Sequence, residues 1–302
     1  MPRPAQILRP LPLFALVACG ADPAAPPAPE APAAEEALAL RPWPAATVTL
    51  LHAGEPPLAP LRLSPPAAGG RELLRYGSTF TLTPAAADGP AAPVVLVEGR
   101  QAALELDPPD ADGAVGLRAT LSNGRRHPQG QAPDPAFAAR LEGRRAAWRL
   151  SPRCEVLGAA LDGAAASGGG GEGADELDTV LEGLVTLCPP LPEAALGVGA
   201  RWAVDEPGDG GAPRRTEWLL LQRLPDGGAV LTFHTREGGP EAPRELLAEG
   251  RVELPAGRAT PTRLDLRGHA RRVVTGPMGE SATVETDWIT LVEGLDAPAG
   301  SP

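Results

Sequence analysis

Few side chains of this sequence could carry out covalent or acid–base chemistry. Lysine is absent, which excludes a Walker phosphate loop, a Schiff-base lysine and a Ser–Lys dyad, because each needs the ammonium group. No Gly-x-Ser-x-Gly or His-Glu-x-x-His motif occurs. The histidines are scattered without metal-ligand spacing: His52, His127, His234 and His269. The sequence therefore predicts no catalytic residue, no metal site and no cofactor. Its reactive groups are three thiols: Cys19, Cys154 and Cys188.

The first of these thiols, that of Cys19, follows a segment with the features of a secretory signal. Arg3 and Arg9 give the amino terminus a positive charge, and residues 11–18 form a short apolar run. Small residues surround the candidate cleavage point. An apolar run of this length is too short to span a bilayer as a helix. Residues 1–18 are therefore predicted to be a cleaved signal peptide.

The string Leu16-Val17-Ala18-Cys19 resembles the lipobox of bacterial lipoproteins at all four positions. The resemblance implies that Cys19 is acylated on its sulfur, becomes the first mature residue and is then acylated on its amino group. Several acyl chains anchor a protein durably, since each buried CH₂ contributes about 0.8 kcal/mol. Pro12 within the apolar run departs from the pattern. An ordinary signal followed by an incidental cysteine is the alternative.

The lipobox also implies where the mature protein resides. In enterobacterial lipoproteins an aspartate directly after the lipidated cysteine favours retention in the inner membrane, and here that position is Gly20. We therefore expect a cell-envelope protein, anchored in the outer membrane and facing the periplasm. Loss of Arg3 and Arg9 with the leader lowers the formal net charge from −11 to −13. An acidic chain is a poor partner for nucleic acid, and only the lipid would hold it on a membrane.

The two remaining thiols, Cys154 and Cys188, are predicted to form a disulfide. A cysteine pair in an oxidising compartment is usually oxidised. By the chain-entropy model, closing a loop of this size contributes roughly 3–4 kcal/mol. Two free thiols or a metal-binding pair are the alternatives.

The rest of the chain divides by composition. Residues 19–45 are rich in alanine and proline, which predicts an extended tether. Residues 46–296 alternate as strands do, either as one body or as two lobes over residues 46–160 and 190–296. At 74–82, for example, Leu, Tyr, Ser, Phe and Leu share one face.

One segment, at about 174–188, has helical periodicity instead, follows a glycine-rich loop and ends at a Pro-Pro pair. Asp226-Gly227 within a Pro-Asp-Gly-Gly turn marks a hairpin. The fold class predicted is mainly β: an antiparallel meander forming a curved sheet, open barrel or sandwich, with one amphipathic helix packed on it.

The body of the chain also resembles uncharacterised exported lipoproteins of myxobacterial type. The resemblance rests on Leu191-Pro192-Glu193, on the string at 197–202 that reads Gly-Val-Gly-Ala-Arg-Trp, and on the Leu-Leu-Arg-Tyr string at 73–76. It covers residues 70–295 and implies no activity and no catalytic residue. Trp202 is expected to be a core anchor.

Three weaker constellations have simple structural interpretations. Asp107, Asp110 and Asp112 could bind calcium weakly, although a solvated acidic turn is favoured. Glu285 and Asp287 share a strand face, as the carboxylate pair of a glycosidase could, but their regular alternation favours an outward face. A basic stripe around His269 could bind an anion or simply face solvent.

The sequence thus favours a lipid-anchored, non-catalytic structural or interaction module, with an envelope protein as partner. The alternatives are a carrier with an apolar ligand in a cavity under residues 177–188, by analogy with half-barrel lipoprotein carriers, and an enzyme without a recognisable motif.

Overall fold

The part of the molecule that the structure describes is mainly β-sheet. The computed structural model describes residues 38–86, 89–90, 92–161, 180, 183–207, 213–239, 242, 244–275 and 281–296. The elements up to residue 161 are β1 Thr47–His52, β2 Glu55–Ala59, β3 Gly70–Ala86, β4 Gly89–Pro90, β5 Val94–Leu106, β6 Val115–Pro128, α1 Pro135–Leu141, β7 Arg145–Leu150 and β8 Val156–Leu161. The later elements are β9 Leu196–Val198, β10 Arg201–Pro207, β11 Pro213–Arg223, β12 Ala229–Gly238, β13 Arg244–Leu254, β14 Arg263–Thr275 and β15 Ser281–Asp296.

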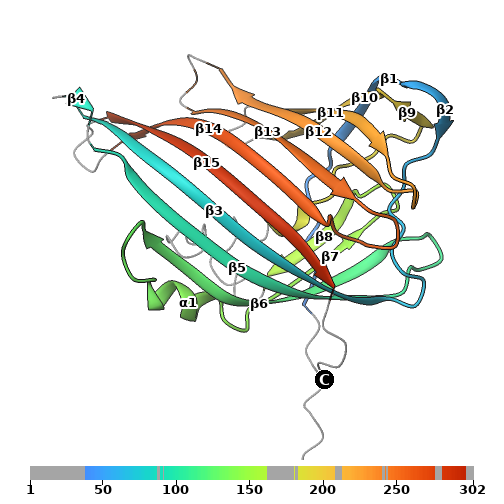
Figure 1. Cartoon of the computed structure of the whole chain (residues 1–302), viewed down its shortest axis with the longest axis horizontal. Coiled ribbons are helices and arrows are strands. Elements are labelled where there is room, and N and C mark those ends of the chain that lie inside the picture. The colour runs from blue at the N-terminus through green and yellow to red at the C-terminus, as the bar shows by residue number, and fades with distance from the viewer. Residues whose placement is uncertain are drawn as a thin grey trace, which may run out of the picture. The chain divides into compact units, whose positions relative to one another are not determined.

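One antiparallel sheet of 13 strands contains nearly all of these strands (Figure 1). Its order is β1-β10-β11-β12-β13-β14-β15-β3-β5-β6-β7-β8, with β4 paired to β3, while β2 and β9 form a separate pair. The pairing of β15 with β3 joins the two halves predicted at 46–160 and 190–296 into this single sheet. Among the described residues the edge strands β1 and β8 do not pair with each other. The prediction of a mainly β, antiparallel curved sheet is confirmed.

Local sequence explains the strands and turns well. Along β3, Leu74 and Tyr76 are buried whereas Arg75 between them is exposed, as the period of two requires. The predicted hairpin joins β11 to β12. There Asp226 accepts a hydrogen bond from the Gly228 amide at 2.9 Å, and Gly227 takes a φ of 92°, which favours glycine.

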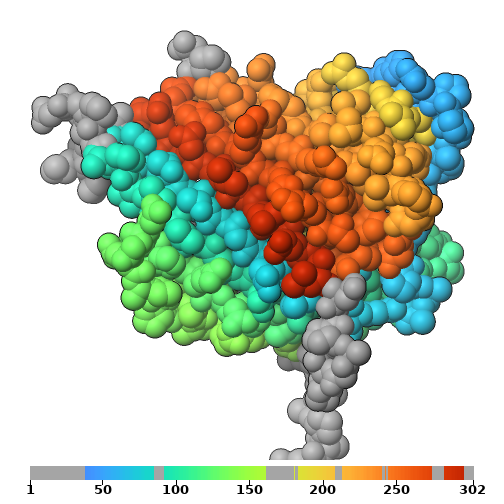
Figure 2. Space-filling view, in the orientation of Figure 1, coloured from blue at the N-terminus to red at the C-terminus, as the bar shows by residue number. Residues whose placement is uncertain are grey.

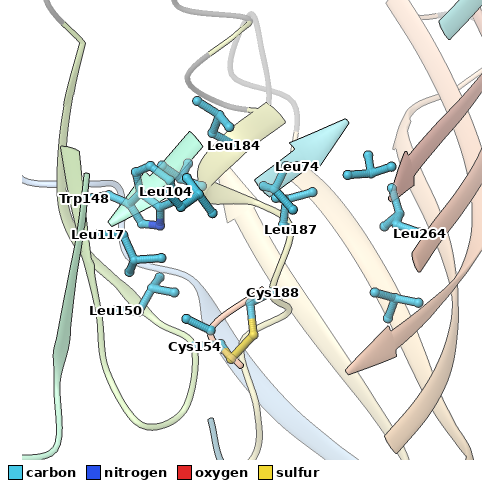
Figure 3. Close-up of a cluster of buried hydrophobic side chains, with 14 of the residues drawn as sticks. Leu74, Leu104, Leu117, Trp148, Leu150, Cys154, Leu184, Leu187, Cys188 and Leu264 are labelled. Atoms are coloured by element: carbon cyan, nitrogen blue, oxygen red, sulfur yellow. A yellow bond between two sulfur atoms is a disulfide. The ribbon is translucent and has the colours of Figure 1, made fainter. Parts of the chain in front are cut away.

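The space enclosed by the sheet is tightly packed at one end (Figure 3). Leucines from β3, β5 and β6 meet Trp148 of β7 and Leu184 there, all with at most 2% of their surface exposed. The predicted disulfide is confirmed. Cys154 and Cys188 are joined beside this cluster, with an S–S distance of 2.05 Å, and both are buried.

The helical segment predicted at 174–188 is only partly described. Val180 and residues 183–185 are helical, whereas residues 174–179 and 181–182 lie outside the described residues. The structure adds a short helix that the sequence reasoning missed, α1. Its signal was present, since the Asp134 carboxylate accepts a hydrogen bond from the Ala136 amide at 2.9 Å and Pro135 follows the cap. None of the helices among the described residues is long and apolar enough to cross a membrane.

The predicted signal peptide, Cys19 and residues 19–37 of the predicted tether lie outside the described residues. Residues 38–45 of that tether are described. Arg41 forms an isolated bridge with Ala159 of β8, through backbone hydrogen bonds of 2.9 and 3.0 Å. Six residues later the chain enters β1 at the opposite edge of the sheet. We call residues 38–46 the strap, because they lead from one edge strand to the other.

Candidate functional site

A cavity of about 1060 Å³ lies on the inner face of the curved sheet, next to the packed end. We call it the inner cavity. Strands from both halves of the chain line it, together with Val180, Gly183, residues 185–190 and strap residues 43–46. Its volume is just above the usual range for small-molecule sites, about 300–1,000 Å³. It occupies the place where the carrier hypothesis needs a cavity.

Strand registers explain which residues face the inner cavity. Phe80 of β3 pairs with Trp288 of β15 on one side and with Leu96 of β5 on the other. The neighbouring row contains Phe233 and Leu266, which flank Gly250 of β13. A third row contains Leu82 and Leu246. We call the half-buried apolar side chains of these three rows that line the cavity the apolar wall: Phe80, Leu82, Leu96, Phe233, Leu246, Leu266 and Trp288.

Every residue of the apolar wall is only half-buried. By contrast, residues of the same strands at the packed end, such as Leu74 of β3 and Leu104 of β5, are at most 1% exposed. The wall is curved and inward-facing, so its exposure is not that of a scattered surface leucine. No described protein group covers the wall fully, and this leaves an apolar surface that an apolar ligand could cover.

The segment 183–190 is fixed over the cavity by three contacts. The Tyr76 hydroxyl donates to the carbonyl oxygen of Gly183 at 3.4 Å, and the Trp202 indole donates to the carbonyl oxygen of Pro190 at 3.0 Å. Between them the disulfide holds Cys188 to Cys154. Trp202 is fully buried, as expected of a core anchor.

A polar cluster interrupts the apolar lining on β5 and β6. The Glu98 carboxylate pairs with Arg100 at 2.8 Å and with Arg126 at 2.7 Å, although only 10% of its side chain is exposed. The Arg100 guanidinium lies over the Tyr76 ring, 4.6 Å from its centroid. Burial raises the pKa of Tyr76 above its ordinary value more than Arg100 lowers it, so the phenol stays neutral and can donate.

A second charged pair lines the cavity at another edge. Glu206 of β10 and Arg214 of β11 face each other across the strands at 3.3 Å, each with about a fifth of its side chain exposed. Thr216 and Thr235 share a hydrogen bond of 2.9 Å in the next row. The inner cavity is therefore amphipathic, with an extended apolar wall and a few placed polar groups, as ligand sites commonly are.

The residues singled out in the sequence do not come together in one site. Cys154 and Cys188 both line the inner cavity, and none of the four histidines, all within the described part, does. His269 lies on the outer face, paired with Asp287 at 3.0 Å, and Glu285 is exposed there too. Among the described residues there is no group of three or more histidines, cysteines or carboxylates that could hold a metal ion.

The acidic turn after β5 has a structural role. Asp110 accepts hydrogen bonds from the backbone amides of Asp112 and Ala114 and pairs with Arg149. The bond from Arg149 is the main reason why the pKa of Asp110 is lowered. Asp107 pairs with Arg118 at 2.9 Å. These partners engage the carboxylates of Asp107 and Asp110, two of the three acidic side chains of the turn.

Sequence reasoning missed the polar cluster altogether. Arg100 and Arg126 are ordinary arginines in the sequence, and Glu98 directly precedes a glycine in a strand of common composition. The one signal was that 98 and 100 fall on the face that alternation assigns to the interior.

Comparisons with known proteins give little guidance. No family model matches the chain, and no curated protein matches it. A solved structure described as "Lipid-protein interactions in lipovitellin" is similar with a TM-score of 0.32 and 11% identity, over 78% of this chain and 26% of that one. The chain thus spans about a quarter of the length of that chain. A likeness at this level supports no conclusion about function.

Proposed function

We propose that this protein is a lipid-anchored carrier of the cell envelope that binds an apolar ligand in the inner cavity. The half-buried apolar wall is the observation that supports this proposal. Covering such a wall removes apolar surface from water, which is favourable by about 25 cal/mol per Å². A protein has no structural need to keep large apolar side chains half-exposed in an inward-facing cavity. A ligand supplies the missing contacts.

The anchor and the cavity fit together in this proposal. Acylation of Cys19 would hold the body at the membrane, facing the periplasm, and the alanine- and proline-rich tether would let it reach a ligand source. The protein is proposed to have no enzymatic role, because binding and release need no catalytic group.

An interaction module is the second candidate, and one observation favours it. Ile289 of β15 is 67% exposed on the outer face of the sheet, the face seen in Figure 2. A protein partner docking there would cover Ile289. A single exposed isoleucine is common on protein surfaces, however, so the inner cavity is the stronger argument.

Two adjacent residues of β3 allow a matched test. Phe80 belongs to the apolar wall, whereas Thr79 is exposed on the opposite face of the same strand. The parent protein in this test is the predicted mature chain, residues 19–302, with Cys19→Ser. This change ensures that no acyl chain of the protein itself can enter the cavity. The protein is titrated with the neutral apolar fluorophore N-phenyl-1-naphthylamine.

We expect the parent and Thr79→Asp to bind the fluorophore equally, and Phe80→Asp to bind it at least about 10-fold more weakly. A carboxylate in an apolar contact must be desolvated, which costs more than about 1.4 kcal/mol. Thermal melting of each protein monitors folding. Absence of binding by the parent, or equal binding by both variants, would contradict the carrier proposal.

A further inference from the structure

We infer that the ligand is an amphiphile with an anionic head and an apolar chain, and that Arg100 binds the head at the deep end of the inner cavity. This inference rests on the proposed function and specifies its ligand class. The head chemistry is that of a carboxylate or phosphate, as carried by a free fatty acid or by a phosphate-headed lipid.

The first observation is that Arg100 is a largely buried cation with few partners. Its side chain is only 11% exposed, and its Nε is buried without a hydrogen-bond partner among the described residues. It pairs with Glu98, a carboxylate that also takes both Nε and Nη2 of Arg126, at 3.0 and 2.7 Å. A guanidinium offers five N–H donors, and leaving buried donors unpaired is unfavourable. Because the one carboxylate of Glu98 is shared by two guanidiniums, the cluster keeps a net positive charge, which an anionic ligand in the cavity would balance.

The second observation is the place of Arg100 within the cavity. It pairs in register with Tyr76, which pairs in turn with Val292, and both of these residues are buried. Gly183 closes this end, since a Cβ built on it would lie 3.1 Å from Nη2 of Arg100. Arg100 is therefore at the end of the cavity that adjoins the packed core.

The third observation is that the apolar wall leads away from Arg100 along two neighbouring strands. Leu96 is four residues from Arg100 on β5, and Leu82 is six residues from Tyr76 on β3. At about 3.3 Å per residue, the Tyr76–Leu82 stretch is roughly 20 Å long. The wall also extends across β15, β14, β13 and β12. An apolar surface of this length that begins beside a cation matches an amphiphile with a charged end better than it matches a molecule that is apolar throughout.

The other charged pair of the cavity is less suited to a head group. Glu206 and Arg214 pair with each other at 3.3 Å on β10 and β11, and the side chain of each is more exposed than that of Arg100. A carboxylate and a guanidinium that neutralise each other exert little attraction on a further anion, whereas on β5 and β6 two guanidiniums share the single carboxylate of Glu98. The observations therefore favour the β5 side of the cavity for the head.

The test uses three probes that share a 16-carbon chain: palmitate, hexadecyl phosphate and hexadecanol. Each is added to the mature chain 19–302 carrying Cys19→Ser, and its affinity is measured by displacement of N-phenyl-1-naphthylamine below the aggregation concentration of the probe. We expect at least one anionic probe to bind roughly 10- to 100-fold more tightly than hexadecanol, as a charge-assisted hydrogen bond allows. The stronger of the two anions distinguishes a carboxylate head from a phosphate head.

Variants assign the preference to Arg100. Arg100→Gln should remove the preference for anions while fluorophore binding persists, because Glu98 keeps its bonds to Arg126. Arg100→Lys should retain part of the preference. The control is Arg125→Gln, since Arg125 is exposed on the neighbouring strand β6. Melting curves confirm that each variant is folded.

The outcomes separate this inference from the proposed function. If all three probes bind alike, or if Arg100→Gln keeps the preference for anions, the head-group inference is wrong and the carrier proposal stands. If the fluorophore and all three probes fail to bind the parent, the carrier proposal fails and this inference fails with it.

Discussion

The two ends of the space inside the sheet are built from the same strands and differ in what covers them. At the packed end, Leu74 of β3 and Leu104 of β5 lie against Trp148 and Leu184, and none of these is more than 2% exposed. At the cavity end of the same strands, Phe80 and Leu96 are half-buried. Since composition and strand pattern continue unchanged, the difference arises from which segments fold over each end.

This contrast assigns two tasks to one sheet. The packed end supplies stability, because its side chains contact protein atoms on all sides. The cavity end contributes less to stability and leaves apolar surface for a ligand. Changes at the two ends should therefore separate stability from binding.

The largest expected effect is at the packed end. Trp148→Ala should lower the free energy of unfolding by about 3–5 kcal/mol, because it removes a large, fully buried side chain and leaves a void. The matched change at the cavity end, Phe80→Ala, should cost about 1 kcal/mol or less, since Phe80 borders the cavity. Urea denaturation measures both free energies. It is followed by far-UV circular dichroism and not by tryptophan fluorescence, because one variant removes a tryptophan. Equal losses of unfolding free energy in the two variants would contradict the division of the sheet into a packed end and a cavity end.

The disulfide should have the next largest effect, and it acts on both ends. Cys154 and Cys188 are 34 residues apart in sequence, so opening this loop should lower stability by roughly 3–4 kcal/mol. The double variant Cys154→Ala, Cys188→Ala also frees the segment that covers the cavity. We expect it to weaken fluorophore binding as well as stability, measured in the same preparation. Loss of stability with unchanged binding would show that the covering segment is held by its other contacts.

The sequence predicts features that depend on neighbouring residues better than features that depend on residues far apart in the chain. The alternation of Leu74, Tyr76 and Phe80 and the Asp226-Gly227 turn are local, and strand and hairpin were both predicted correctly. The disulfide was also predicted, because only two thiols remained once Cys19 was set aside. The helix α1 was missed although Asp134 and Pro135 give a local capping signal.

Long-range features could not be predicted in the same way. The pairing of β15 with β3 depends on the register between strands that are distant in sequence, and the place of Arg100 beside Tyr76 depends on the register between β3 and β5. Many registers satisfy the same period of two, so the local pattern does not choose among them. The candidate site is made of such pairings, which is why the fold was predicted better than the site.

The strap should have a smaller effect, confined to the cavity end. Arg41→Pro removes the backbone N–H that donates to Ala159 at 2.9 Å, and one such bond is worth about 1 kcal/mol. Arg41→Ala keeps the backbone bond and is the control. Loosening the strap should speed release of the bound fluorophore, because residues 43–46 line the cavity. Stopped-flow measurement of the release rate tests this. Identical rates in the two variants would mean that the strap does not limit exit.

The smallest effect is expected on the outer face of the sheet. Ile289 is 67% exposed, so Ile289→Ser should change stability by no more than about 0.5 kcal/mol and leave fluorophore binding unaltered. Its neighbour Trp288 belongs to the apolar wall, and Trp288→Ser should weaken fluorophore binding severalfold. The two residues are adjacent on β15 and point to opposite faces, so the pair compares the faces at one place in the strand. If Ile289→Ser weakened fluorophore binding as much as Trp288→Ser, the inner face would not be the binding surface. The outer face would then be the better candidate for interaction with a partner.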